Sequence, residues 1–303
     1  MTEIIAAFVQ FPSLGHWVNE PNRGRLSMSL KTVLAIVGAT DTAPDISFAI
    51  EFATEHDAHL SILIIAATLQ PAAADYPIAS DWVEQMQDEI NTLHRIRQQA
   101  EDLCQMSDVS FDVDFLYEDI FIAQSNIGMR AMYSDIVLVG PGLRGDVQLR
   151  RAVVAATAFD SRTPLLLVPN TGLSSLKPKN VLVAWNSRPE AAFAAKAALE
   201  MLIAAEEVHL VLVDPDSAYF RSGDEPGADI AAFLARHGVK VIVEQLASAG
   251  RRTEDVLRQH ARELGCDMMV MGAYGHSRLR ERIFGGVTAS ILQDCNVPVF
   301  MAR

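Results

Sequence analysis

The sequence predicts a doubly wound α/β protein built from two similar domains in tandem. Short apolar segments alternate with helix-like segments along the chain, a pattern typical of a mostly parallel sheet covered by helices on both faces. The second half repeats the first with an offset of roughly 150 residues, which is the size of a domain. At 303 residues, half of them hydrophobic, the chain can fill two cores.

Strand-like segments carry the repeat, and matched pairs occur in the same order in both halves. The pairs are Lys31–Val37 with Lys179–Trp185, His59–Ile65 with His209–Asp214, Ser134–Gly140 with Cys266–Gly272, and Thr163–Pro169 with Val297–Ala302. Because the order is kept, we interpret the chain as an internal duplication of one domain rather than a solenoid.

Each half is expected to form a five-stranded, mostly parallel sheet flanked by helices. The segments are short and nearly continuously apolar, as in strands that are buried on both faces. In the first half the expected strands are Val33–Val37, Leu60–Ile65, Phe111–Leu116, Asp135–Gly140 and Leu165–Val168. In the second half they are Val181–Trp185, His209–Val213, Val239–Glu244, Met268–Gly272 and Pro298–Met301.

Three helices can be predicted in some detail between these strands. Alanine-rich Pro189–Ala205 begins with a proline, which the first helical turn tolerates. Thr253 is expected to cap the N-terminus of a helix over Glu254–Leu264, and Gly265 to end it. The first half also carries a longer insert, in which Trp82–Leu103 is expected to form a long amphipathic helix.

The domain boundaries follow from the repeat. Residues 1–27 lie outside it as an N-terminal extension, and they lack the basic start of a signal peptide. Residues 28–170 form the first predicted domain, and residues 181–303 form the second. Residues 171–180 contain Gly, Ser and Pro without apolar periodicity, and are expected to be a linker.

Charge and cysteine content limit the classes of function. The formal net charge of −13 argues against general binding to nucleic acid or to an anionic membrane surface. Three scattered cysteines do not form a disulfide framework, which favours a cytoplasmic location. No apolar run approaches the roughly 20 residues that a transmembrane helix needs.

The sequence points to a ligand in one place, the loop after the fourth strand of the second half. The apolar run Met268–Met271 ends in Gly272, Gly275 follows, and Gly285-Gly286 stand before Val287, Thr288 and a helix-like segment. Glycines let the backbone approach an anion, and free N–H groups at a helix start bind phosphate. A tight turn at Gly272 and close helix packing at Gly285-Gly286 remain as structural alternatives.

Basic residues in the same loop can be interpreted in two ways. His276 and Arg278, with Arg280 and Arg282, could attract a polyphosphate, or they could form an ordinary solvated loop. Asp214 and Asp216, which follow the second strand, could approach Mg²⁺, although ordinary loop carboxylates are the favoured interpretation.

This arrangement resembles a universal stress protein domain, and the duplicated chain resembles the tandem members of that family. The resemblance covers about residues 28–303 and is strongest in the second half, where GAYGHSRLRE and GGVT stand at the family's spacing. In the nucleotide-binding branch, Gly-x2-Gly-x9-Gly-Ser/Thr holds the phosphates and ribose of ATP. The resemblance therefore implies that Gly272, Gly275, Gly285 and Gly286, with Val287 and Thr288, bind these groups.

Two departures from the family pattern bear on affinity. Gly286 stands where the family has Ser or Thr, and the lost hydroxyl removes a hydrogen bond worth about 0.5–1.5 kcal/mol. Asn186 stands where the family usually has an aspartate near the adenine and ribose, and Val213 is where the family uses the backbone beside adenine. The resemblance thus implies weakened rather than lost binding.

The first half is expected to have lost this site. Leu143 falls at the position of Gly275, and counting back from Pro164 places Arg151 and Ala152 at Gly285 and Gly286. Gly140–Gly145 does fit G-x-G-x-x-G, but it follows the fourth strand of its half rather than the first. That position argues against a dinucleotide site.

Two hypotheses of different classes result. In the first, a cytoplasmic, stress-related protein binds ATP, ADP or AMP, with Mg²⁺ as an accompanying ion, and acts as a regulatory switch. No residue is a convincing general base, so little or no hydrolysis is expected. In the second, the same fold is a nucleotide-independent interaction protein. The resemblance also implies that Val297–Ala302 pairs with a like strand, which Thr163–Val168 of the same chain could supply; a homodimer of whole chains stays open.

Overall fold

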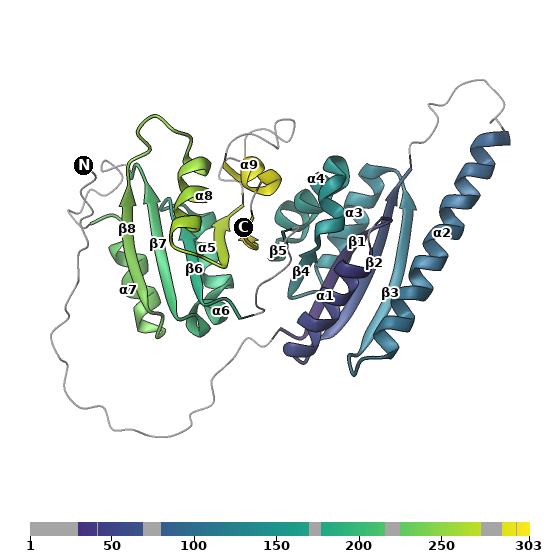
Figure 1. Ribbon diagram of the computed structural model, residues 1–303, viewed down its shortest axis with the longest axis horizontal. Coiled ribbons are helices and arrows are strands. Elements are labelled where there is room, and N and C mark those ends of the chain that lie inside the picture. Colours follow the sequence, from purple (N-terminus) through teal and green to yellow (C-terminus); the bar gives the residue numbers. More distant parts are fainter. Residues whose placement is uncertain are drawn as a thin grey trace.

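The computed structural model describes residues 30–40, 42–68, 80–169, 177–215, 225–273, 287–294 and 296–303. Within these residues the strands form one ten-stranded sheet that runs through both halves of the chain (Figure 1). The fold is therefore a tandem α/β arrangement with a mostly parallel sheet, as the alternation of apolar and helix-like segments predicts.

The first half alternates strands and helices from its first described residues. Its elements are β1 (Thr32–Gly38), α1 (Thr42–Glu55), β2 (His59–Ala67), α2 (Ser80–Gln105), β3 (Phe111–Glu118), α3 (Ile120–Ala131), β4 (Ile136–Val139), the short 3₁₀ turn η1 (Pro141–Gly145), α4 (Val147–Ala155), the π-helical turn η2 (Ala156–Ser161) and β5 (Leu165–Leu167).

The second half repeats this order of strands. Its elements are β6 (Asn180–Ala184), α5 (Pro189–Ala197), α6 (Leu199–Ala204), β7 (Glu207–Val213), α7 (Ala228–Arg236), β8 (Val241–Leu246), α8 (Thr253–Glu263), β9 (Met268–Gly272), α9 (Val287–Asp294) and β10 (Val299–Ala302).

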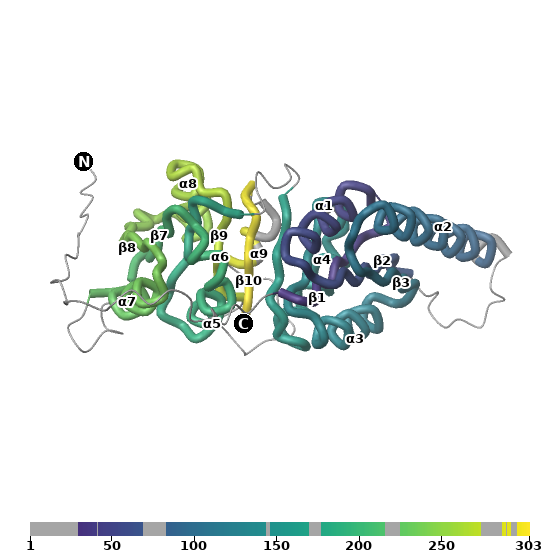
Figure 2. Tube along the Cα trace, turned by 90° about the horizontal axis from the view of Figure 1, so that it is seen from below, coloured from purple at the N-terminus to yellow at the C-terminus, as the bar shows by residue number. Residues whose placement is uncertain are grey.

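The strand order shows how the halves are joined. Across the sheet the order is β3-β2-β1-β4-β5-β10-β9-β6-β7-β8, so each half has the same internal order and the two last strands meet in the middle. All described pairs are parallel except β5 with β10, where Leu166 lies opposite Phe300. In Figure 2, β10 lies at the centre of the molecule, between the two halves. The expected pairing of Thr163–Val168 with Val297–Ala302 inside one chain is confirmed.

Alternate side chains of the strands enter two cores on opposite faces of the sheet. Val33 and Val37 of β1 belong to one cluster, which α1, α2, α5 and α7 cover. Leu34 and Ile36 belong to the other, which α3, α4, α8 and α9 cover. Burial on both faces explains why these strands are apolar almost without interruption.

The predicted helices are found, with two corrections. Pro189–Ala205 is not one helix, because α5 ends at Ala197 and α6 starts at Leu199. Thr253 is not the N-cap of α8 but its first residue, and Arg252 precedes it without a side-chain capping bond. Gly265 does follow the end of α8, with a positive φ of 62° that suits glycine.

Other predicted boundaries are close to those observed. The amphipathic helix expected over Trp82–Leu103 is α2. Asn180, assigned to the linker, already belongs to β6, and β8 begins at Val241 rather than at Val239. Of the helices described, none reaches the combination of length and apolar character that a bilayer-spanning helix needs.

A partly buried His–Glu–His cluster connects β7, β8 and α8. Nδ1 of His209 lies 2.6 Å from Oε1 of Glu244, and Nε2 of His260 hydrogen bonds to Oε2 of the same carboxylate. The bond to Glu244 raises the pKa of His260 above its ordinary value of 6.5. Burial raises the pKa of Glu244, but hydrogen bonds from His260 and His209 outweigh it, so this pKa is lowered overall.

The raised pKa of His260 makes the stability of this region depend on pH. Protonated His260 stabilises the fold fully below pH 6.5, and this contribution is lost as the pH rises through the raised pKa. We expect His260→Gln to lower the free energy of unfolding by about 1–3 kcal/mol at pH 6, and by clearly less at pH 9. Urea denaturation at both pH values measures the difference.

The exposed His237 at the end of α7 provides the control for that experiment. His237→Gln should change the free energy of unfolding little at either pH, because its Nδ1 contacts a backbone carbonyl and no carboxylate. A His260→Gln cost that is the same at pH 6 and pH 9 would contradict a charge-assisted bond to Glu244.

Candidate functional site

The predicted site of the second half lies at β6, where the order of the strands in the sheet reverses. β6 has β9 on one side and β7 on the other, so the connections from β6 and β9 leave toward opposite faces. Ala184 pairs with Met271 and with Val211, which brings the carboxyl ends of all three strands to one edge. In open α/β sheets, ligands bind at this kind of switch point.

Gly272 closes β9 at that edge and lies directly against α5. A Cβ added to Gly272 would be 2.7 Å from the backbone nitrogen of Ala191 and 2.7 Å from the backbone carbon of Glu190. Both contacts are to main chain in the first turn of a helix, which cannot rotate away. Among the described residues, glycine at this position is therefore explained by close strand–helix packing.

Asn186 lies just after β6 and Val213 ends β7, and the carboxyl ends of these two strands lie at the same edge of the sheet. Asn186 is exposed, and its Oδ1 accepts a hydrogen bond of 3.2 Å from the backbone N–H of Arg188, so the side chain shapes the entry into α5. Val213 is half-buried and is the last residue of β7. Both residues lie at the edge of the sheet at which a ligand of the switch point would bind.

Asp214, the residue considered for Mg²⁺, is exposed but already accepts a hydrogen bond from another part of the chain. Its carboxylate accepts a 3.0 Å hydrogen bond from the backbone N–H of Ser248. Bonds from the side chain and backbone of Ser248 hold the pKa of Asp214 below its ordinary value. Among the described side chains, no group of three His, Cys, Asp or Glu residues is placed to hold a metal ion; Asp216 lies outside the described residues.

The start of α9 supplies the remaining described part of the predicted site. Val287 is its first residue and is half-buried, and Thr288 is buried. The other predicted positions, Gly275, His276, Arg278, Gly285 and Gly286, lie outside the described residues. Their roles stay predictions from the sequence.

In the first half, the protein's own carboxylates occupy the corresponding backbone donors. Both carboxylate oxygens of buried Asp45 accept from the backbone N–H of Gly142, at 3.2 Å each. Oδ1 of Asp146 accepts from the backbone N–H groups of Gln148 and Leu149, at 3.0 and 2.9 Å, and so caps α4. A phosphate would meet negative charge where it needs free N–H groups.

The sequence comparison between the halves placed the helix start incorrectly. Counting back from Pro164 matched Arg151 and Ala152 to the glycines before α9, but both residues lie inside α4, which begins at Val147. Leu143 is buried in η1, as expected of a side chain that replaces a phosphate-facing glycine. Asp45 and Asp146 were missed, although an Asp just before or just inside a helix is a recognisable capping signal.

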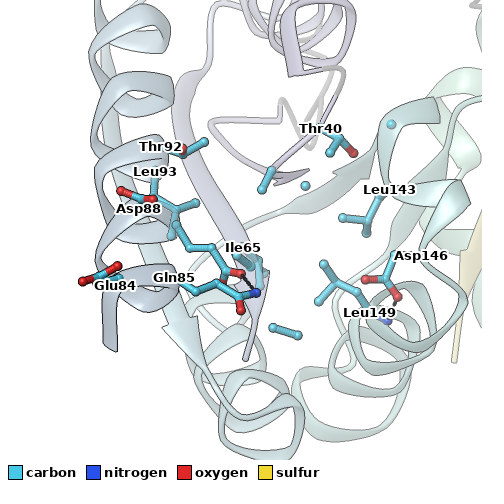
Figure 3. Close-up of a pocket in the computed structure, with 16 residues that line it drawn as sticks. Thr40, Ile65, Glu84, Gln85, Asp88, Thr92, Leu93, Leu143, Asp146 and Leu149 are labelled. Atoms are coloured by element: carbon cyan, nitrogen blue, oxygen red, sulfur yellow. Dashed lines mark hydrogen bonds between the residues drawn. The ribbon is translucent and has the colours of Figure 1, made fainter. Parts of the chain in front are cut away.

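A cavity of about 660 Å³ lies beside this carboxylate-capped loop (Figure 3). It opens over the ends of β1 and β2, between α2 on one side and η1 with the start of α4 on the other. Ile65, Leu93, Leu143 and Leu149 give it apolar walls. Gln85 reaches in from α2 and donates a 3.1 Å hydrogen bond to Glu89, which also lines the cavity. Its formation depends on α2, whose distance from η1 cannot be read from the sequence.

The cysteines within the described residues behave as small apolar side chains. Burial raises the pKa of the Cys104 thiol to about 11 and that of the Cys266 thiol to about 12, so neither is ionised near neutral pH. Both are free and buried. Cys295 lies outside the described residues.

Comparison with known proteins finds a family resemblance in the second half. Residues 177–303 match the model of the universal stress protein family. The universal stress protein Slr1230 of Synechocystis sp. (strain ATCC 27184 / PCC 6803 / Kazusa) is 33% identical over 70 residues, which are 23% of this chain and 23% of that protein.

Solved structures extend the similarity to both halves at the level of the fold. A universal stress protein from Archaeoglobus fulgidus DSM 4304 matches with a TM-score of 0.63 and 15% identity, over 89% of this chain and 96% of that one. The functionally unknown protein PA1789 from Pseudomonas aeruginosa PAO1 matches with a TM-score of 0.54 and 14% identity, over 90% and 92% of the two chains. Identities this low show a shared fold and nothing further.

Proposed function

We propose that the second half, whose residues 177–303 match the model of the universal stress protein family, binds an adenine nucleotide, and that its occupancy acts as a regulatory switch. ATP, ADP or AMP would lie over the ends of β6, β7 and β9, with Mg²⁺ accompanying the phosphates. The contacts would come from Asn186, the backbone at Val213 and the glycine-rich segment that follows Gly272.

The observation that carries this proposal is the position of the glycine motif in the fold. Gly272 ends β9 at the switch point and Val287 begins α9, so Gly275, Gly285 and Gly286 all fall in the connection between that strand and that helix. A glycine-rich connection that leads into a helix start is suited to phosphate, because it combines free backbone N–H groups with the positive end of the helix dipole.

The first half supports a stoichiometry of one nucleotide per chain. Its corresponding connection is closed by the carboxylates of Asp45 and Asp146, which already accept from the backbone. A triphosphate at that place would have to displace two anions that the fold holds in position. Nucleotide in the first half is therefore disfavoured.

The proposed role is binding and release of nucleotide rather than turnover. Asp214 follows β7 at the same edge of the sheet, and its carboxylate is held by a hydrogen bond from Ser248. Without a positioned general base, attack of water on the phosphate is not accelerated. A change in protein partners on nucleotide binding would make the protein a switch.

A nucleotide-independent interaction protein is the second candidate. Close packing of Gly272 against α5 explains that glycine without a ligand. Gly286 also lacks the hydroxyl of the family motif, and Asn186 replaces its usual aspartate. These three positions favour a domain that has kept the fold after losing the nucleotide.

Calorimetric titration of Mg²⁺-ATP into the full chain separates the candidates. We expect one site per chain, and Gly275→Val should weaken binding by at least about tenfold, since its side chain would take the space of the phosphate. Gly145→Val, in the matching connection of the first half, is the control and should leave binding unchanged.

Each other outcome has a definite meaning. No binding by the wild-type chain at millimolar Mg²⁺-ATP would overturn the nucleotide switch and leave the interaction protein. Two sites per chain, with one lost in Gly145→Val, would show that the first half has kept a nucleotide site despite Asp45 and Asp146.

A further inference from the structure

We propose that the cavity of the first half is a second ligand site, and that its ligand is a small organic amine rather than a phosphate. The proposal concerns residues of the first half alone, so it does not depend on nucleotide binding in the second half. Four features of the cavity carry it: its place in the sheet, its size, the occupied backbone donors and the chemistry of its walls.

The cavity lies at the switch point of its half of the sheet. β1 has β2 on one side and β4 on the other, and Gly38, Ala39 and Thr40, which end or follow β1, line the cavity. This is the position at which open α/β sheets bind ligands. Its volume of about 660 Å³ lies within the range of small-molecule sites, about 300–1,000 Å³.

The occupied backbone donors exclude an anion from this cavity. Gly142 donates its N–H to Asp45, and the first turn of α4 donates to Asp146. Gly142 and Asp146 both line the cavity. The cavity lies at the switch point, but the backbone N–H groups beside it are already hydrogen-bonded to carboxylates. It is therefore suited to a cationic ligand rather than to a phosphate.

The walls of the cavity specify that ligand. Of the described residues that line it, none is Lys, Arg or His, whereas four are Asp or Glu. In Figure 3, Glu84 and Asp88 point outward from α2 at the rim, whereas Gln85 faces the cavity from α2 and Asp146 faces it from the other side. Glu89, the hydrogen-bonded partner of Gln85, also lines the cavity.

Glu89 and Asp146 retain the capacity to accept further hydrogen bonds. Glu89 accepts from Gln85 and, at 2.7 Å, from the Tyr117 hydroxyl, whereas an ionised carboxylate can accept about four. The two backbone bonds to Asp146 end on Oδ1, which leaves Oδ2 as an acceptor. An ammonium group donates without accepting, so it matches these walls.

The apolar part of the lining requires a ligand with a hydrocarbon body. Ile65, Leu93, Leu143 and Leu149 line the same cavity as the carboxylates of Glu89 and Asp146. A chain of methylene groups that ends in ammonium groups would contact the apolar side chains along its length and the carboxylates at its ends. Polyamines have this construction, and spermidine is a suitable probe.

The test is calorimetric titration of spermidine into the full chain, in the absence of nucleotide. We expect saturable binding at one site. Glu89→Gln combined with Asp146→Asn should weaken spermidine binding by at least about tenfold, because both negative charges are lost. The amide side chains still offer an oxygen as acceptor, so the variant tests the charge rather than the hydrogen bond. Ala66→Phe, which places a ring in the cavity without changing charge, should abolish binding.

A matched control separates this site from general attraction to an acidic surface. Glu101→Gln combined with Asp102→Asn removes two charges from the same helix, α2, away from the cavity, and should leave the affinity unchanged. Thermal unfolding followed by circular dichroism checks that each variant is folded.

Three results would overturn the proposal. One is the absence of saturable binding by the wild-type chain at millimolar spermidine. Another is equal weakening in the control and cavity variants, which would show diffuse attraction to the surface. The third is unchanged binding in folded Ala66→Phe. None of them bears on Mg²⁺-ATP in the second half, so the two proposals can fail separately.

Discussion

Gly272→Ala is expected to lower the free energy of unfolding by about 1–3 kcal/mol, the usual range for overpacking at a tightly packed position. The added methyl group would meet the backbone of Glu190 and Ala191 at 2.7 Å, closer than carbon atoms tolerate. Because the contacts are main-chain atoms of α5, the helix itself must shift from β9. Urea denaturation followed by circular dichroism gives the loss directly.

Gly38→Ala is the matched control, since Gly38 also ends a strand at a switch point. Its added Cβ would lie 3.4 Å from the side-chain Cδ1 of Leu143, which is nearly ordinary contact, so the expected change is within about 0.5 kcal/mol. If Gly272→Ala were as mild as Gly38→Ala, α5 would not pack on β9 as described. Its glycine would then be explained by a ligand alone.

The same comparison bears on the origin of the two halves. Gly140 directly follows β4 as Gly272 ends β9, and a Cβ at Gly140 would collide with the carboxyl group of Asp45. In both halves the glycine therefore makes room for the helix that follows the first strand. In the first half that helix contributes a carboxylate to the loop, which excludes phosphate.

The sequence predicts the fold well because the repeat and the burial pattern are local properties of the chain. Strands buried on both faces leave continuous apolar runs, and ten such runs in a repeated order specify two like halves. The break between α5 and α6 at Ala198 has no sequence signal, because alanine suits a helix interior. At α8, Thr253 offered a plausible cap, yet the helix starts one residue earlier than a cap there would allow.

The site could be predicted only in part, because it depends on which elements face each other. Gly272, Asn186 and Val213 lie at one edge of the sheet and Thr288 lies at the start of α9, where the sequence pattern predicts them, and their role in binding stays a prediction. The cavity of the first half could not be foreseen, since it forms between α2 and η1, which lie far apart in sequence.

Phe300→Ala is expected to have the largest effect on stability, a loss of about 3–5 kcal/mol, as is usual for removing a buried phenylalanine. Phe300 lies in β10 and is 2% exposed, and its partner in β5, Leu166, is 3% exposed. These strands form the antiparallel pair that joins the halves, and both side chains belong to one apolar cluster. Urea denaturation measures the loss, and Phe121→Ala, at a residue 80% exposed on α3, should cost less than about 0.5 kcal/mol.

Hydrogen exchange in the first half of the chain shows whether Phe300→Ala weakens the pairing of β5 with β10 or only the packing around β10. If β10 stabilises β5 through this pairing, amide hydrogen exchange at Leu165–Leu167 should accelerate in Phe300→Ala, although the substitution lies in β10. A loss of stability that leaves exchange in β5 unchanged would mean that each half holds its last strand independently. Faster exchange in both strands would show that the two halves share stabilising contacts at the centre of the sheet, through which a ligand bound to one half would affect the stability of the other.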